Sequence, residues 1–164
     1  MPTKKTKKKK TASVAVQLAC RSAGVPSPAS LRRWARLAAS SGSVTLRVVG
    51  SAEGRRLNRD FRDRDYATNV LSFDYRSGGE ALDGDIVLCH PVIAREAREQ
   101  QKPLRDHYAH LVVPGLLHLR GMDHLRPAAR EAMERREIGL LAKIGIPDPY
   151  VARAVESLRD RIRP

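Results

Sequence analysis

The spacing of apolar residues changes along this chain, and this change constrains the fold more than any other feature of the sequence. In the first half, apolar and polar residues alternate in segments 13–20 and 43–50, while segments 69–75 and 83–90 are rich in β-branched residues. Both patterns are typical of β-strands. In the second half, apolar residues recur every three or four positions, which indicates helices. The sequence therefore predicts an α+β fold: a single domain in which a mixed β-sheet of about four strands packs against a layer of helices.

Serine and proline residues mark where these helices begin. Ser27 followed by Pro28 indicates a cap and a first helical turn, and Ser51 is expected to cap a short helix that ends near residue 61. Pro103 and Pro127 each open a later helix. A charged helix is expected over 92–100, directly after the fourth strand. Ala128, Met133, Ile138, Leu141 and Ile144 are expected on or near the buried face of the last helix.

The charge of the chain indicates a polyanionic partner. The formal net charge is +13, and six of these charges are lysines in the first ten residues, so +7 remains on the rest of the chain. We expect residues 1–11 to be a disordered basic tail and residues 12–164 to be the folded domain. A surplus of positive charge on a small domain favours nucleic acid. Because aromatic residues make up only 4% of the chain, phosphate contacts are expected to dominate over base stacking.

Neither a membrane span nor an export signal is apparent. No apolar run approaches the roughly 20 residues that cross a bilayer, and the N-terminus lacks an apolar segment with a cleavage site. Cys20 and Cys89 are isolated in apolar segments, which is typical of buried thiols in a reducing compartment. We expect a cytoplasmic protein that has no membrane partner.

Residues 112–124, VVPGLLHLRGMDH, have the spacing of a metal site. Positions 114 and 118 are one helical turn apart, Gly121 allows a turn, and His124 follows it. Three ligands at positions 114, 118 and 124 would leave one coordination position for water. The pattern is related to that of zinc proteases, H-E-x-x-H-x-x-G-x-x-H, but Gly115 stands where those enzymes have their general base. Peptide hydrolysis is therefore not expected.

Several ordered motifs resemble those of the YbeY family. The phrase at 114–124 is similar to the family signature H-G-x-L-H-L-x-G-x-D-H, whose second residue is also glycine. LNRDFRDRDYATNVLSFDY at 57–75 resembles the family segment that joins LN-x-x-Y/F-R to T-N/D-V-L-S-F. LDGDIVLC at 82–89 resembles its G-D-I/L-V-I-C strand, and DPY at 148–150 its C-terminal ending. The resemblance extends over most of the chain beyond the tail.

This resemblance implies a single-strand-specific, metal-dependent endoribonuclease that binds one Zn²⁺ ion per chain. Such proteins act in maturation of the 3′ end of small-subunit ribosomal RNA and in ribosome quality control. Carried onto this chain, His118 and His124 match two of the three metal ligands, and Arg62 matches the family's functionally important arginine. The implied partners are ribosomal RNA, the small ribosomal subunit and ribosome-associated proteins, and no DNA partner is expected.

Proline at position 114 departs from the family signature, which has a histidine there. Pro114 offers no donor to a metal ion, and a proline in a helix interior costs about 3 kcal/mol. Either the helix kinks here, or a new helix begins at Pro114. His110 lies eight residues before His118, about 12 Å along a helix, so it cannot replace the missing ligand. We expect His118 and His124 to bind metal much more weakly, with water or a carboxylate completing the site.

Other interpretations of these residues stay open. The runner-up function is a non-catalytic relative that binds RNA or the ribosome and has lost its metal. Arg62 in isolation is one solvated charge among the arginines of 55–64. His107 and His110 are packing or hydrogen-bonding residues, or they contact RNA. Asp123 either orients a metal ligand or holds the turn. One base change converts a histidine codon to a proline codon, so resequencing the source gene tests whether Pro114 is natural.

Overall fold

A computed structural model describes residues 11–76, 81–122, 125–151, 158–159 and 161–162. The basic segment 1–10 and the glycines at 78 and 79 lie outside these residues. The prediction of a disordered tail over 1–11 therefore stays a prediction. The elements in chain order are β1 (Ser13–Leu18), α1 (Pro28–Ala38), β2 (Gly42–Val49), α2 (Ser51–Arg62), β3 (Val70–Asp74), β4 (Leu82–Cys89), α3 (His90–Glu99), α4 (Leu104–Leu119) and α5 (Pro127–Ala142).

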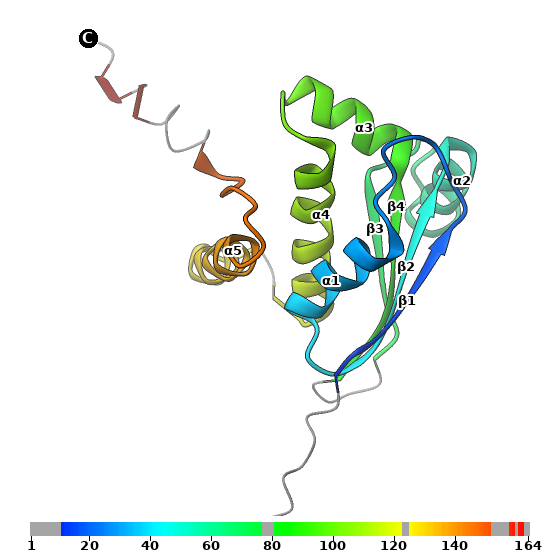
Figure 1. Cartoon of the computed structure of the whole chain (residues 1–164), viewed down its shortest axis with the longest axis horizontal. Helices are drawn as coiled ribbons and strands as arrows, with labels where there is room; N and C mark the ends of the chain where they lie inside the picture. The colour runs from blue at the N-terminus through cyan, green and yellow to red at the C-terminus, as the bar shows by residue number, and fades with distance from the viewer. Residues whose placement is uncertain (1–10, 77–80, 123–124, 152–157, 160, 163–164) are drawn as a thin grey trace, which may run out of the picture.

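The strands form one mixed sheet in the order β1-β2-β4-β3. The β1–β2 and β2–β4 pairs are parallel, whereas β3 runs antiparallel to β4. In Figure 1, α1 and α4 lie against one face of the sheet, α2 lies on the other, and α5 packs on the side of α4 that faces away from the sheet. The predicted class, a single α+β domain with a four-stranded mixed sheet, is confirmed.

Alternating residues of the strands supply two apolar clusters, one on each face of the sheet. The larger cluster joins Leu46, Ile86 and Leu88 to Trp34 of α1 and Leu116 of α4. The smaller cluster lies under α2 and includes Val49, Leu71, Val87 and Cys89. Because side chains alternate between the two faces of a strand, adjacent residues such as Ile86 and Val87 reach different clusters. The sheet is thereby buried between helices on both faces. The part of the chain that the structure describes has no helix long and apolar enough to cross a membrane.

The helix starts were predicted with two errors. One is α3, which was expected over 92–100 but begins at His90, directly after β4. Ser27 caps α1 as expected, and its hydroxyl accepts a hydrogen bond from the backbone N–H of Ser30 at 3.2 Å. Ser51, in contrast, is the first residue of α2, and Gly50 is the cap. The chain leaves β2 at Val49, so the single connecting residue, Gly50, takes the extended backbone conformation of a cap. A capping preference alone does not show where the preceding strand ends.

The buried face of α5 was predicted only in part. Met133, Leu141 and Ile144 are buried, whereas Ala128 is exposed and Ile138 is half-buried. The buried stripe runs through Met133, Glu137, Leu140, Leu141 and Ile144, at the three- and four-residue steps of one helical face. Ala128 and Ile138 lie off this stripe. Glu137 was not predicted on this face, although it is buried. The Glu137 carboxylate accepts a hydrogen bond from the Tyr150 hydroxyl.

Helix α4 continues through Pro114 without a break. The alternative in which a new helix begins at Pro114 is therefore wrong. Residues on both sides of the proline are fully buried: Val112, Val113, Leu116 and Leu117. We infer that this packing between the sheet and α5 offsets the lost backbone hydrogen bond, since tertiary contacts routinely override local helix propensity.

Candidate functional site

Arg62, the last residue of α2, is held against the free edge of the sheet. Its Nη2 donates a hydrogen bond to the backbone oxygen of Ser72 in β3 at 2.8 Å. Its guanidinium carbon lies 5.4 Å from the centre of the Phe73 ring, within cation–π range. Arginine has five N–H donors, so this anchor leaves donors for a further anion. The side chain is exposed yet has a defined position.

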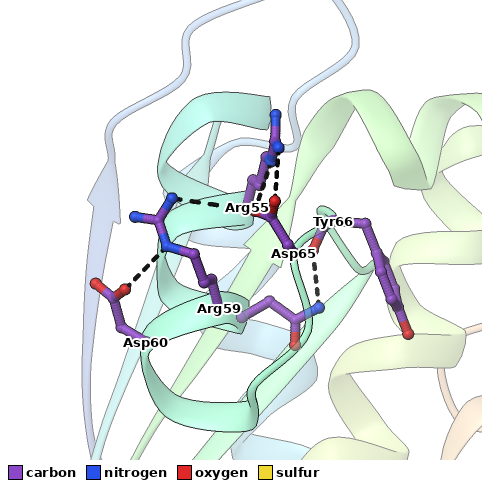
Figure 2. Close-up of polar contacts among 6 residues, drawn as sticks. Arg55, Arg59, Asp60, Asp65 and Tyr66 are labelled. Carbon is purple, nitrogen blue, oxygen red and sulfur yellow. Dashed lines mark hydrogen bonds and ion pairs between the residues drawn. The ribbon is translucent and has the colours of Figure 1, made fainter.

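The other arginines of this region differ from Arg62 in their partners. Arg55 makes two hydrogen bonds of 2.8 Å to the Asp65 carboxylate, and Arg59 bonds Asp60 at 3.2 Å. Figure 2 shows these two arginines turned toward their acidic partners. The bond from Arg55 lowers the pKa of Asp65. Arg55 and Arg59 thus have acidic partners in α2 and in the loop that follows it, whereas Arg62 is anchored by a neutral carbonyl.

Helix α4 approaches the same strand from the opposite face of the sheet. Gly115 makes this close approach possible, because an added Cβ would lie 3.1 Å from the Ile86 side chain and 3.8 Å from Ser72 Oγ. Ser72 therefore contacts Arg62 through its backbone oxygen and faces α4 through its side chain. His118 follows Gly115 by three residues and so lies on the same side of α4.

His118 is exposed in the last turn of α4. Its Nδ1 lies 3.1 Å from the backbone oxygen of Met122. A carbonyl oxygen only accepts, so this contact requires a proton on Nδ1. This arrangement depends on the turn at Gly121, which has a φ of 87° as the sequence predicted. A proton on Nδ1 suits a histidine that binds metal through Nε2.

The described residues do not complete a three-donor metal site. Position 114 is a proline, and His124 and Asp123 lie outside the described residues. Within the ranges that the structure describes, no group of three His, Cys, Asp or Glu residues could hold a metal ion. His118 is thus the one described side chain at a family ligand position. These donors do not fit a zinc site with three histidines.

The two earlier histidines of α4 are engaged elsewhere. His107 is buried, and its Nε2 lies 2.8 Å from the Glu96 carboxylate of α3. His110 Nε2 donates to the backbone oxygen of Pro147 at 3.0 Å, while its Nδ1 accepts from Lys102 at 3.0 Å. Burial lowers the pKa of both histidines, although Glu96 acts in the opposite direction on His107. The structure supports the hydrogen-bonding role for both.

Arg76 is a second cation at this edge that the sequence analysis did not single out. It follows β3 and bonds the Asp74 carboxylate at 2.7 Å, which lowers the pKa of Asp74. Its Nη2 also lies 4.0 Å from the point where a Cβ would stand on Gly121. Arg76 therefore reaches the turn that follows His118. Its place two residues beyond the edge strand was the available signal, but the sequence did not show which strand forms the edge.

The site thus has two sides along β3. We call Arg62, Ser72 and Phe73 the arginine side, and Pro114, Gly115 and His118 the histidine side. The arginine side can bind an exposed anion such as a phosphate through a fixed guanidinium. The histidine side offers an imidazole on a turn and no donor one helical turn before it.

Comparisons with known proteins match most of this chain. The family model described as Endoribonuclease YbeY matches residues 5–145. An Endoribonuclease YbeY from Aromatoleum aromaticum is 58% identical over 127 residues, which cover 76% of this chain and 81% of the relative. One from Thiobacillus denitrificans is 48% identical over 139 residues, covering 84% of this chain and 95% of the relative.

A solved structure supports the fold. The solution structure of a Thermotoga maritima protein aligns with a TM-score of 0.52 at 21% identity and covers 79% of this chain and 90% of that one. At this identity the likeness concerns the fold alone.

Proposed function

Because the chain belongs to the YbeY endoribonuclease family, we propose that it is a cytoplasmic, single-strand-specific endoribonuclease of ribosome maturation. Its task would be to mature the 3′ end of small-subunit ribosomal RNA and to contribute to ribosome quality control. Its partners would be ribosomal RNA, the small ribosomal subunit and ribosome-associated proteins.

The position of Arg62 is the observation that carries this proposal. Cleavage of a phosphodiester places negative charge on the phosphate oxygens in the transition state. A guanidinium fixed beforehand stabilises that charge without reorganisation. Arg62 meets this requirement, since a backbone oxygen and an aromatic ring hold it at the sheet edge.

The metal dependence of the reaction is a further part of the proposal. The expected ion is Zn²⁺, and its ligands would be His118 and His124. With Pro114 in place of a third donor, we propose that the ion is held weakly and that cleavage is correspondingly slow. Pro114 also supports a second candidate function, in which the chain binds RNA or the ribosome and does not cleave it.

The test compares the chain with its Pro114→His and Pro114→Ala variants. Each is dialysed against a mild chelator, and its zinc content is measured. Cleavage of single-stranded RNA and of the matching duplex is then followed with and without added zinc. Pro114→Ala is the matched control, because it restores the backbone N–H of the helix without adding a metal donor.

We expect Pro114→His to retain more zinc and to cleave single-stranded RNA faster than the other two proteins. Equal zinc retention by the unaltered chain and Pro114→His would refute the loss of a donor. Tight RNA binding without cleavage in all three proteins would favour the second candidate function.

A further inference from the structure

Three aromatic side chains form a row beside Arg62. Phe61 and Phe73 meet edge to face, with ring centres 5.3 Å apart and planes at 77°. Tyr75 follows Phe73 by two residues, and its backbone N–H donates to Asp83 at 2.8 Å, so the strand pairing continues to this point. Residues two apart on a strand share a face. We call Phe61, Phe73 and Tyr75 the aromatic row.

The exposure of Phe61 and Tyr75 is not explained by folding, whereas Phe73 is half-buried against the apolar cluster under α2. The chain has only two phenylalanines, and both are in this row. Phe61 is 60% exposed and Tyr75 is 56% exposed. A large apolar ring contributes most to stability when it is buried, and exposed rings in a surface cluster indicate a binding site.

The surroundings of the aromatic row carry both charges: arginines lie beside Phe61 and Phe73, whereas the Tyr75 hydroxyl donates to the Asp85 carboxylate at 3.0 Å. The Arg62 guanidinium stands over Phe73. Five arginines and three aspartates lie between residues 55 and 65. Arg55 and Arg59 have acidic partners, whereas Arg56 and Arg64 make no ion pair with any residue that the structure describes. A partner that combines flat apolar faces with regular negative charge fits this surface.

Single-stranded RNA has this combination of chemistry. Its unpaired bases can stack on aromatic rings while its phosphates contact arginines. A duplex keeps its base faces stacked inside and cannot offer them. In the Phe61–Phe73 pair the edge of one ring points at the face of the other, so the two rings are not stacked face to face on each other.

We propose that the aromatic row is a base-stacking subsite for single-stranded RNA, adjacent to the phosphate that Arg62 binds. The inference rests on the proposed function and adds to it a physical basis for preferring unpaired RNA. It adds stacking to the phosphate contacts that the composition led us to expect, since few rings suffice when they are gathered at one edge.

The test measures the binding of a fluorescently labelled single-stranded oligoribonucleotide and of the same strand annealed to its complement. The proteins are the full chain, Phe61→Leu and Tyr66→Leu. Tyr66 is the matched control, because its ring is 56% exposed on the following loop and makes no ring contact with a described residue. Fluorescence anisotropy gives the dissociation constants over a range of salt concentrations.

We expect Phe61→Leu to weaken single-strand binding by about 5- to 20-fold, and Tyr66→Leu to change it by less than about twofold. Duplex binding should not change. The slope of log affinity against log salt should also stay the same, because stacking releases no counterions. Tyr75→Leu provides a second variant of the aromatic row, and thermal unfolding checks that each variant is folded.

Two results would overturn the inference. Single-strand binding by Phe61→Leu as tight as that of the unaltered chain would exclude base stacking there and would leave the aromatic row to a protein partner. An equal loss in Tyr66→Leu would show that the row has no special part. Failure of the proposed function is distinguishable, because the unaltered chain would then neither bind nor cleave single-stranded RNA.

Discussion

The two sides of the site depend on the sequence in different ways. On the arginine side, Arg62 is positioned by a backbone carbonyl and by the Phe73 ring, so its geometry rests on the fold. On the histidine side, the metal binding that we propose depends on which side chain stands at position 114. Packing of α4 tolerates the proline there, because the helix is buried on both sides of it. The position of Arg62 thus does not depend on a histidine at position 114.

The largest change in stability is expected at Gly84 of β4, which lies close to both Phe73 of the arginine side and Leu119 of α4. At Gly84, an added Cβ would lie 2.5 Å from the backbone oxygen of Phe73 and 3.2 Å from the Leu119 side chain. Gly84→Val should lower the free energy of unfolding by about 3 kcal/mol, since β3 or α4 must move. Urea unfolding followed by circular dichroism measures this change.

The control for this substitution is Gly139→Ala. Apart from the helix's own backbone and the neighbours in the chain, no atom of the described residues lies within 4 Å of a Cβ added there, near the C-terminal end of α5. Alanine should leave the stability unchanged or raise it by up to about 1 kcal/mol. A similar loss in both variants would show that Gly84 has no special role in joining the two sides.

The arginine side is tested by Arg62→Gln. Without the guanidinium, we expect the rate of single-stranded RNA cleavage to fall about 100-fold, the effect of removing one preorganised donor. The rate is measured in the Pro114→His background, where faster cleavage is expected. Arg33→Gln removes an exposed cation from α1, which covers the opposite face of the sheet, and should have little effect. An equal fall in the cleavage rate of both variants would show that Arg62 contributes no more than another exposed arginine.

The histidine side is tested for stability by Pro114→Ala. Alanine restores a backbone hydrogen bond of the helix and relieves the crowding by the proline ring, which together stabilise the folded chain by about 3 kcal/mol. It also makes the unfolded chain more flexible, which lowers the free energy of unfolding by about 1 kcal/mol. The free energy of unfolding should therefore rise by about 2 kcal/mol. A decrease, measured by urea unfolding, would mean that the packing around α4 has adapted to the proline ring.

A smaller effect is expected from pH. Burial lowers the pKa of His90, His107 and His110 in the folded protein. The unfolded chain therefore binds more protons below the ordinary histidine pKa of about 6.5, and folding becomes less favourable as the pH falls through this value. The urea midpoint should decrease between pH 7 and lower values, and less steeply in His110→Gln. A midpoint that is independent of pH would contradict the assignment.

Local patterns predicted most of the elements and only part of the site. The strands at 13–18 and 42–49 follow from alternation, and the start of α1 follows from Ser27 and Pro28. The cap was wrongly predicted at Ser51 because its position depends on where the preceding strand ends. The burial of Ala128 was wrongly predicted because it depends on how the last helix packs against its partner. The roles expected for His124 and Arg62 stay predictions.

The sequence by itself determined the family, the strand and helix pattern, and the proline at position 114, because these are properties of residue identity and short-range spacing. The tertiary structure decided that β3 is the edge strand, that Arg62 is anchored to Ser72, and that Phe61 meets Phe73. These contacts join residues ten or more positions apart. Their formation depends on how the sheet and helices pack, and no local pattern contains that information.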